Sequence, residues 1–360
     1  MNDRIYVCHT FYHAYISFLK ELALRDKASA EGTDPGDATI VLSKLSNNFG
    51  DSRERYVATG IFKEALEYDE KREDSFPELA RYKKPGNIIV NTINRIRLTN
   101  LFAKALEADI PCDFKKYRDI YVFCDKDPIV TYLNKHKIRY HALEDGLNTL
   151  KYIDLARVTD KKFFGFKEFL SRKLNLIVMP DGHSKYCVDM EVNDISAIKY
   201  PCDNYIELPR KTLTDRLTDA DKEILVRAFI RDYDTLKALV KESEGEDKIL
   251  ILTDPLCTLD VREKIFRDIV KMYEPEGRVF IKPHPRDTLD YKTLFSDCPQ
   301  FDATVPMEIL NFIPGLHFKK AVGVLTEMKA VTFADEAIRL GADFMDAYEE
   351  PSIHRQNDYI

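Results

Sequence analysis

The sequence has no tryptophan and only 13 glycines in 360 residues, and these glycines form neither of the common phosphate-binding loops. No GxGxxG follows the first predicted strand, and no GxxxxGK[ST] occurs anywhere in the chain. A phosphorylated ligand would therefore have to be held by cationic side chains, hydroxyl groups and helix N-termini.

The cysteines lack the spacing of a metal site or a disulfide framework. They are odd in number, scattered, and without a CxxC pair. Several lie in apolar runs, where a reduced thiol packs as a small hydrophobic group. We expect a reducing compartment and no structural zinc site. The seven are Cys8, Cys112, Cys124, Cys187, Cys202, Cys257 and Cys298.

Long apolar runs and an excess of positive charge are also missing. No stretch approaches 18 uninterrupted apolar residues, and the N-terminal residues lack the pattern of a signal peptide. The formal net charge of -7 argues against a general nucleic-acid-binding protein. We expect a cytoplasmic protein, peripheral at most at the inner face of the membrane, and an anionic substrate would need a local basic site.

Short β-branched or aromatic runs alternate with longer helical patterns, which predicts parallel sheets covered by helices on both faces. The predicted strands are 4–8, 39–43, 119–124, 139–143, 204–208, 248–253, 278–282 and 321–325. The predicted helices include 11–24, 87–107, 128–137, 221–241 and 260–273. Two doubly wound Rossmann-type domains facing a central cleft, a GT-B-like α/β architecture, follow from this pattern.

The same pattern predicts the domain boundaries. Residues 1–155 are expected to form one Rossmann-like domain, 156–244 an irregular connecting region, 245–345 a second Rossmann-like domain and 346–360 a tail. Within the connecting region, residues 161–173 place aromatic residues among five lysines and arginines. A helix with its aromatic residues in the core is the simpler interpretation. Contact with an anionic membrane or with a second subunit of a homodimer is the alternative.

In the second block, polar side chains follow consecutive predicted strands, so that parallel pairing would bring them to one edge of the sheet. Each has a simpler role as well, since Asp260 or Thr326 can cap a helix and Glu308 can favour a helix start. Their co-occurrence favours a sugar-nucleotide site, in which His284 protonates a leaving phosphate and Thr326 with neighbouring amides binds it. Its candidate residues are Thr253, Asp260, Lys282, His284, Pro285, Glu308, Gly323, Leu325 and Thr326.

The stretch RVFIKPHPRD carries His284 between Pro283 and Pro285, which restrict the backbone on both sides of the imidazole. Lys282 and Arg286 are close in sequence and should lower the pKa of His284, although strand alternation can turn either side chain away.

The first block offers two weaker candidates. The predicted strand at 139–143 ends in the acidic pair Glu144 and Asp145, either of which could act as a general base, although a plain Asp-Gly turn is an equal alternative. Thr10 and His13 flank the first strand-to-helix turn and could bind an acceptor, or could be a capping threonine and a surface histidine.

The chain resembles the bacterial sialyltransferases of the GT-B type, and in particular glycosyltransferase family 52, the lipooligosaccharide sialyltransferase family. The opening YVCHTFYHAYI is similar to that family's first strand and helix. The EDG at 144–146 matches its acidic motif, and the KPHP at 282–285 matches its HP motif. The VLT that ends at Thr326 lies where the family has a phosphate-binding Ser/Thr motif.

The resemblance implies an inverting, metal-independent transfer of sialic acid, or a related nonulosonic acid, from a CMP-activated donor to a glycan hydroxyl. It makes His284 the general acid or phosphate ligand, Glu308 the ribose ligand and Thr326 the phosphate ligand. It implies a role in lipooligosaccharide or capsule biosynthesis at the bacterial surface. The base is Asp260 in the closer family and Glu144 or Asp145 in the wider group, and we favour Asp260.

Two departures from the family pattern bear on the donor: Glu327 follows Thr326, and Asp254 stands where a neutral residue is expected. The alternatives are therefore a GT-B enzyme that uses another donor, such as a UDP-hexose or CMP-Kdo, and a non-catalytic glycan-binding or assembly subunit.

Overall fold

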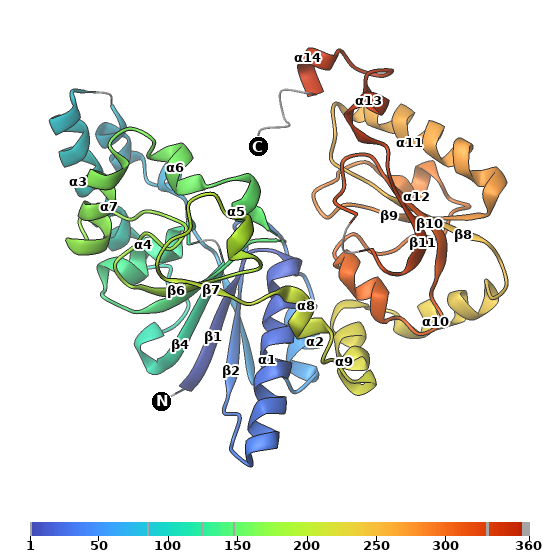
Figure 1. The fold of residues 1–360 in the computed structure, drawn as a ribbon, viewed down its shortest axis with the longest axis horizontal. Coiled ribbons are helices and arrows are strands. Elements are labelled where there is room, and N and C mark those ends of the chain that lie inside the picture. Colours follow the sequence, from blue (N-terminus) through green and yellow to red (C-terminus); the bar gives the residue numbers. More distant parts are fainter. Residues whose placement is uncertain (1, 85, 124, 147, 329–330, 355–360) are drawn as a thin grey trace. The chain divides into compact units, whose positions relative to one another are not determined.

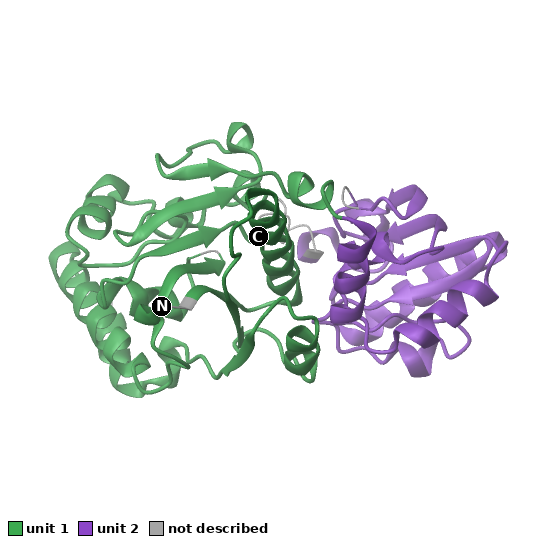
Figure 2. Ribbon diagram, turned by 90° about the horizontal axis from the view of Figure 1, so that it is seen from below, with its two compact units in different colours: residues 1–217 green, residues 218–360 purple. Residues whose placement is uncertain are grey.

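A computed structural model describes residues 2–84, 86–123, 125–146, 148–328 and 331–354. Cys124 and the last six residues of the predicted C-terminal tail lie outside this range. The six described cysteines are all free thiols. The chain divides into two compact units, Met1–Leu217 and Thr218–Ile360 (Figure 2).

The first unit contains one sheet of seven parallel strands in the order β3-β2-β1-β4-β5-β6-β7 (Figure 1). Between β1 and β4 the strand order reverses, as in a doubly wound Rossmann sheet, and ligands usually bind at such a point. The strands are β1 Asn2–Cys8, β2 Ala38–Ser43, β3 Glu64–Tyr68, β4 Tyr117–Phe123, β5 Tyr140–Leu143, β6 Cys187–Val192 and β7 Tyr205–Glu207.

Helices connect these strands and bury apolar residues against the sheet, with Ile5, Val7, Val122 and Ala142 at the centre of the core. The helices are α1 Phe11–Glu31, α2 Ser52–Ala58, α3 Ile88–Leu106, α4 Pro128–Lys135, α5 Thr149–Tyr152, α6 Leu155–Thr159, α7 Phe164–Glu168 and α8 Arg210–Thr214. Short helical turns are η1 Glu73–Ser75, η2 Pro77–Lys83, η3 Phe114–Lys116, η4 Phe169–Lys173 and η5 Ile195–Ala197.

The limits of α1 follow from its sequence. Thr10 is the N-cap, and its hydroxyl oxygen accepts a hydrogen bond from the His13 backbone N–H at 3.1 Å. Gly32 ends the helix with φ of 65°, a left-handed conformation that glycine adopts without strain. The hydroxyl of Thr10 is therefore engaged in starting the helix that carries His13.

The second unit contains a sheet of four parallel strands in the order β11-β10-β8-β9. The strands are β8 Lys248–Leu252, β9 Arg278–Lys282, β10 Phe318–Gly323 and β11 Ala334–Arg339. Its helices are α9 Asp219–Phe229, α10 Tyr233–Glu242, α11 Leu259–Tyr273, α12 Tyr291–Leu294, α13 Gly341–Met345 and α14 Pro351–His354. Two turns complete it, η6 Glu274–Glu276 and η7 Met307–Phe312.

The predicted fold class, α/β with doubly wound parallel sheets, is confirmed for both units. The domain boundary lies elsewhere: residues 156–217, predicted as a connecting region, belong to the first unit and add β6 and β7 to its sheet. The predicted helix 221–241 is two helices, because the Asp232 side chain accepts the Thr235 backbone N–H and so caps a new helix.

Candidate active site

The carboxyl ends of β8, β9 and β10 meet at one edge of the second sheet, which brings together polar residues that are far apart in sequence. Thr253 and Asp254 follow β8, His284 follows β9, and Thr326 follows β10. The Thr253 hydroxyl accepts the His284 backbone N–H at 3.0 Å. The strand order reverses between β8 and β10, so this edge is the expected ligand site of the unit.

His284 has a defined tautomer. Its Nδ1 accepts a hydrogen bond from the Arg286 backbone N–H at 3.1 Å, so the neutral ring carries its proton on Nε2. Burial, followed by the charges of Arg286 and Lys282, lowers the pKa of His284 to about 4. This confirms the direction predicted from the basic neighbours. At neutral pH the residue is an uncharged hydrogen-bond donor through Nε2.

A buried carboxylate, Asp287, supports the turn that carries His284. Its Oδ1 accepts from Arg262 Nη1 at 2.6 Å, and its Oδ2 accepts from the Tyr291 hydroxyl at 2.7 Å and from the Thr253 hydroxyl at 3.3 Å. Arg262 also donates to the Leu256 carbonyl. Sequence analysis missed Arg262 and Asp287, although Asp287 is the last residue of the quoted RVFIKPHPRD.

Lys282 points into the protein. Its side chain is 5% exposed, and its ammonium donates to the carbonyl oxygens of Pro283 at 2.8 Å and Ala303 at 3.0 Å. Burial lowers the pKa of Lys282 to about 7. Arg286, in contrast, is exposed. Strand β9 ends at Lys282, and the turn that follows it places the two cations beside His284 in different environments.

The predicted phosphate-binding group at Thr326 already has an anionic partner. The Asp254 carboxylate accepts the Thr326 hydroxyl at 2.8 Å and the backbone N–H groups of Leu325 at 3.0 Å and Thr326 at 3.2 Å. A side chain on Gly323 would lie 3.0 Å from Thr326 Cβ, so the close approach needs a glycine or a shift of Thr326. The three donors therefore already bind an anion, which is the Asp254 carboxylate of the protein itself.

The two acids predicted as site residues of the second unit, Asp260 and Glu308, lie on α11 and on η7. Asp260 is exposed in the first turn of α11, and hydrogen bonding from the Thr258 hydroxyl lowers its pKa. Glu308 lies in η7, where burial raises its pKa against the opposing charge of Lys282. Pro285 is exposed beside His284.

In the first unit, the two acids of the EDG motif have different environments. Glu144 is buried, and its carboxylate accepts the backbone N–H groups of Leu150 at 2.9 Å and Asn193 at 2.8 Å. Asp145 is 34% exposed, and its Oδ1 pairs with His13 Nε2 at 2.8 Å. Although burial opposes the shift, the His13 contact lowers the pKa of Asp145 to about 2. Asp145 therefore remains available to a ligand, whereas Glu144 holds the chain in place.

His13 is not a surface histidine. It is buried, stacks on Phe123 with ring centroids 4.1 Å apart, and accepts the His9 backbone N–H on Nδ1. Its neutral form must then carry the proton on Nε2 and donate to Asp145. Any contact of His13 with an acceptor would therefore run through Asp145.

Sequence analysis missed further titratable residues at the switch point between β1 and β4. His9 Nε2 lies 2.6 Å from Glu70 Oε2, and its Nδ1 lies 3.3 Å from Asp127. Asp125 is fully buried, and burial with the nearby charge of Asp181 raises its pKa to about 7. Perturbed groups of this kind cluster at functional sites. The signal available in the sequence was the CDKD stretch that follows the fourth strand.

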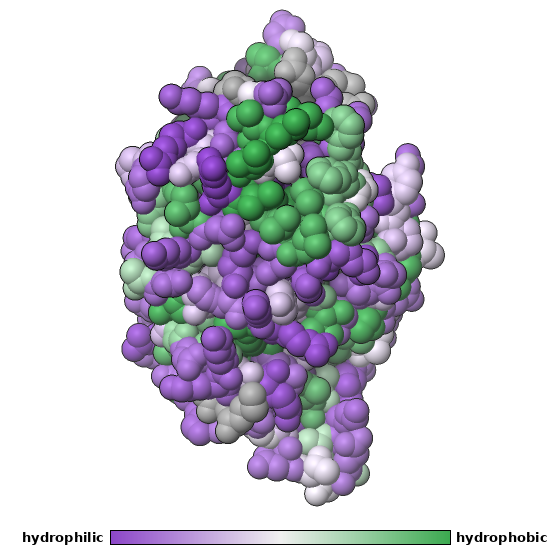
Figure 3. Space-filling view, turned by 90° about the vertical axis from the view of Figure 1, so that its left-hand side faces the viewer, coloured by the Kyte–Doolittle hydropathy of each residue, from purple (hydrophilic) through white to green (hydrophobic). Residues whose placement is uncertain are grey.

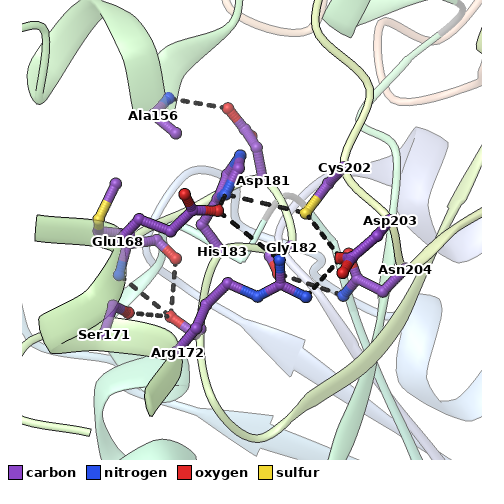
Figure 4. A network of polar contacts seen from close by, with 12 residues as sticks. Ala156, Glu168, Ser171, Arg172, Asp181, Gly182, His183, Cys202, Asp203 and Asn204 are labelled. Carbon is purple, nitrogen blue, oxygen red and sulfur yellow. Dashed lines mark hydrogen bonds and ion pairs between the residues drawn. The ribbon is translucent and has the colours of Figure 1, made fainter. Parts of the chain in front are cut away.

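Figure 4 shows a third polar network, around His183. His183 Nδ1 lies 2.9 Å from Glu168 Oε1 and 3.8 Å from Cys202 Sγ, and the three donor atoms lie within 4.8 Å of one another. These ligand types suit a transition metal. Arg172, however, lies 3.6 Å from the same Glu168 oxygen and pairs with Asp203, so an ion-pair network accounts for the arrangement. The expectation of no metal stays a prediction.

Comparison with known proteins places these residues in a family context. The model of glycosyltransferase family 52 matches residues 66–322. An uncharacterized protein of Haemophilus influenzae is 29% identical over 184 residues, which are 49% of this chain and 54% of that protein. The chain thus matches about half the length of this curated relative.

Two solved structures share the fold. One, a sialyltransferase from Photobacterium damselae, corresponds to the GT-B domain and aligns with a TM-score of 0.52 at 12% identity over 99% of this chain and 97% of its own. The other, a 2,6-sialyltransferase from a Photobacterium species in complex with CMP and lactose, aligns with a TM-score of 0.51 at 9% identity. The alignment covers 93% of this chain and 71% of that protein. At these identities the similarity extends to the GT-B fold.

Proposed function

The chain belongs to glycosyltransferase family 52, and from this premise we propose that it is a sialyltransferase-like enzyme. It transfers sialic acid, or a related nonulosonic acid, from a CMP-activated donor to a glycan hydroxyl, with inversion and without a metal. The glycan belongs to a surface polysaccharide such as lipooligosaccharide or capsule.

The observation that carries this proposal is the tautomer of His284. A neutral imidazole with its proton on Nε2 can donate a hydrogen bond to the departing phosphate oxygen of CMP, which stabilises the charge of the leaving group without a metal. A pKa of about 4 makes His284 a strong acid once protonated, and at neutral pH a hydrogen-bond donor. Asp287 and Thr253 hold the backbone on which this donor depends.

The donor site extends along the same sheet edge. Thr326 and the backbone N–H groups of Leu325 and Thr326 bind the phosphate, which requires the Asp254 carboxylate to withdraw from them. Gly323 permits that approach. The ribose is assigned to Glu308 by the family resemblance, and burial raises the pKa of that carboxylate against the opposing charge of Lys282.

For the base that deprotonates the acceptor hydroxyl, we propose Asp260 over Asp145. Asp260 is exposed, and a hydrogen bond from the Thr258 hydroxyl lowers its pKa. Its carboxylate is therefore ionised at neutral pH. Asp145 already accepts a hydrogen bond from His13 and lies 3.9 Å from the Lys126 ammonium, and both contacts make it a weaker base. We prefer both to Glu144, because each oxygen of the Glu144 carboxylate already accepts a backbone N–H.

One observation favours a second candidate, a GT-B glycosyltransferase with a different nucleotide donor. Asp254 places a negative charge on the donors proposed for the CMP phosphate. If the phosphates of the donor bind elsewhere at this sheet edge, the Asp254 carboxylate can keep its hydrogen bonds to Leu325 and Thr326.

Calorimetric titration with CMP, UDP and their sugar conjugates separates these candidates. The proposal expects binding of CMP and release of CMP from CMP-sialic acid in the presence of an acceptor glycan. Binding of UDP without CMP would transfer the assignment to the second candidate. Glycan binding without turnover of any nucleotide sugar would identify a non-catalytic subunit.

Two variants of His284 test its role. His284→Gln keeps an amide N–H that can reach a phosphate but cannot transfer a proton, whereas His284→Ala removes both functions. We expect turnover to fall by about 100-fold or more in both, with CMP affinity weakened more in His284→Ala. Near-normal turnover in either variant, with an unchanged unfolding midpoint, would return His284 to a structural role.

A further inference from the structure

Polar residues follow the carboxyl ends of five neighbouring strands of the first sheet. These strands lie in the order β3-β2-β1-β4-β5, on both sides of the point where the strand order reverses. Ligands of doubly wound sheets usually bind at this edge. We call these residues the strand-end cluster, and they are Glu70 after β3, Ser43 at the end of β2, His9 after β1, Asp127 after β4 and Asp145 after β5.

The buried carboxylate of Glu70 connects the ends of β1 and β2 with the start of α4. Its Oε2 accepts from the Ser43 hydroxyl at 2.7 Å and lies 2.6 Å from His9 Nε2, and its Oε1 accepts the Ile129 backbone N–H at 2.8 Å. Because Ile129 is the second residue of α4, Glu70 takes an N–H that the N-cap residue of a helix usually binds. The N-cap residue, Asp127, makes no capping hydrogen bond, so its carboxylate remains for other partners.

One nitrogen of His9 is buried without a hydrogen bond. The residue is 2% exposed, and its Nδ1 makes no hydrogen bond in the described part of the chain, although it lies 3.3 Å from Asp127 Oδ2. The contact with Glu70 places the proton of a neutral imidazole on Nε2, so Nδ1 can donate to Asp127 only when His9 carries a second proton. Burial opposes that charge, but the hydrogen bond to Glu70 and the charge of Asp127 raise the pKa of His9.

A carboxylate in front of a buried histidine occurs twice at this sheet edge. Asp127 is 18% exposed and lies against His9, and Asp145 is 34% exposed and lies against His13. The His9 backbone N–H donates to His13 Nδ1, which links the two arrangements. Each histidine thus orients a carboxylate that stays partly open to a ligand.

The charges around Asp127 determine which class of ligand fits. Burial raises the pKa of Asp127, and the charges of Glu70 and Asp145 raise it further, whereas those of His9 and Lys126 lower it. Carboxylates only accept hydrogen bonds, so the ligand must supply donors, and an anion such as phosphate is disfavoured. The Lys126 ammonium, 3.9 Å from Asp145, disfavours a cation. Hydroxyl groups are uncharged and both donate and accept, so a sugar is the ligand class that fits.

The exposed apolar area of the same unit has a different character. Figure 3 faces the side of the first unit that carries α3 and α7, and it shows an apolar area flanked by hydrophilic side chains. The prediction that the aromatic residues of 161–173 lie in the core holds for Phe164, which packs against a core cluster, and is wrong for Phe163, Phe166 and Phe169, which are at least half exposed. No helix in the described part of the chain combines the length and apolar character needed to cross a membrane. Apolar side chains supply hydrophobic contact, whereas the hydroxyl groups of a ligand need fixed acceptors such as those of the strand-end cluster.

We propose that the strand-end cluster binds a hexopyranose unit of the acceptor glycan, with Asp127 and Asp145 accepting hydrogen bonds from its ring hydroxyls. His9 and Glu70 are positioning residues that hold Asp127 and do not touch the sugar. The role of this sugar as the acceptor rests on the proposed function, whereas the recognition of a hexopyranose does not. A site that binds hydroxyl groups with prepositioned carboxylates discriminates against analogues that lack one of those hydroxyls.

Saturation-transfer NMR of the full chain measures this binding without any nucleotide. The probes are methyl β-galactopyranoside, methyl β-glucopyranoside and lactose. We expect saturable binding of at least one probe, weakened about tenfold or more by Asp127→Asn, because a hydrogen bond to a charged group is lost. Asp119→Asn is the matched control, since Asp119 lies near the amino end of β4 and pairs with Arg118. No saturable binding of any probe, or equal affinity of the wild type and Asp127→Asn, would overturn the proposal.

Monodeoxy analogues of the bound probe test for a direct contact and leave the protein unaltered. Loss of the hydroxyl that donates to Asp127 should weaken binding to the wild type about tenfold, because the carboxylate is left without its partner. Asp127→Asn should bind the same analogue and the parent probe with affinities within about twofold of each other. If every analogue loses the same affinity in both proteins, Asp127 does not touch the sugar and the proposal is wrong.

The positioning role of His9 predicts a dependence on pH. Four titratable groups face His9, namely Glu70 after β3, Asp127 after β4, Asp145 after β5 and His13 on α1. Because the pKa of His9 is raised above 6.5, Nδ1 holds Asp127 below that pKa and releases it as the pH rises through it. The affinity of the wild type for the probe should therefore fall between pH 6 and pH 9. His9→Gln should bind about tenfold more weakly than the wild type at pH 6 and show no such fall, and a fall of equal size in both proteins would contradict the role of His9.

Assays with CMP-sialic acid distinguish failure of the sugar site from failure of the proposed function. If both hold, Asp127→Asn should transfer sialic acid with a KM for the acceptor raised about tenfold. A wild-type protein that binds a hexopyranoside at the strand-end cluster but neither binds CMP nor cleaves CMP-sialic acid would overturn the proposed function and support the sugar site. Transfer of sialic acid by the wild type, with the same acceptor KM in Asp127→Asn, would overturn the sugar site alone.

Discussion

Replacing Lys282 by methionine tests the consequence of burying a cation beside the candidate active site. The Lys282 ammonium has two carbonyl oxygens as partners, and burial lowers its pKa from 10.5 to about 7. Between these two pH values the unfolded chain binds more protons than the folded protein. The free energy of unfolding contributed by Lys282 therefore rises with pH in this window and is constant below it.

The magnitude follows from the two pKa values. The full difference of about 3.5 units corresponds to about 5 kcal/mol, at 1.36 kcal/mol per unit. Between pH 7 and pH 9 the wild-type protein should gain about 2 kcal/mol from this residue alone. Methionine fills a similar volume without a charge, so the free energy of unfolding of the variant lacks this dependence on pH. The difference in free energy of unfolding between the variant and the wild type should therefore change by the same amount, in favour of the wild type, between pH 7 and pH 9.

Urea unfolding at pH 6, 7, 8 and 9 measures the difference between the two proteins. The change of this free-energy difference with pH is the test, because the loss of the hydrogen bonds to Pro283 and Ala303 shifts the difference equally at every pH. Lys319→Met serves as the control, because Lys319 is 43% exposed and pairs with Asp247 at the surface. Parallel profiles of wild type and Lys282→Met from pH 6 to 9 would refute the argument from burial.

Two further substitutions address the acids near the candidate sites. Asp145→Asn should lower the free energy of unfolding by about 1 kcal/mol at pH 6, after allowance for the one-third exposure of Asp145. Because its folded pKa of about 2 lies below the usual 3.8, this difference should vanish as the pH falls to 2, and a constant difference would contradict the pairing with His13. Asp254→Asn should raise CMP affinity about fivefold in calorimetry, since a charge about 4 Å from the phosphate is removed. Weaker binding would instead show that the carboxylate orders the Thr326 turn.

Much of the fold could be predicted from the sequence because its central strands are continuous apolar runs. β2 and β8 are buried along their whole length, and both were predicted to within one or two residues. β3, β6 and β11 were missed because acidic residues interrupt their apolar pattern, as in the EALEY of β3 and the ADEAIR of β11. These strands bury fewer positions, so periodicity alone does not reveal them.

The candidate site was predictable where neighbours in sequence determine the property. The pKa of His284 is lowered by burial and then by the charges of Arg286 and Lys282, and these two residues could be named in advance because they are within two positions of it. The pairing of Asp254 with Thr326 joins residues 72 positions apart, and that of Arg262 with Asp287 joins residues 25 apart. Such contacts depend on strand order and on side-chain direction, neither of which a single sequence specifies.

The four hydrogen bonds that Asp287 accepts have a consequence for which substitutions position 287 tolerates. Its two oxygens serve Arg262, Leu289, Tyr291 and Thr253, and so connect α11, the turn after β9, α12 and the end of β8. Asparagine offers one acceptor oxygen instead of two, and glutamate moves both by a methylene group. No other side chain reproduces this geometry, so the His284 turn, although exposed in part, should be among the least substitutable segments of the second unit.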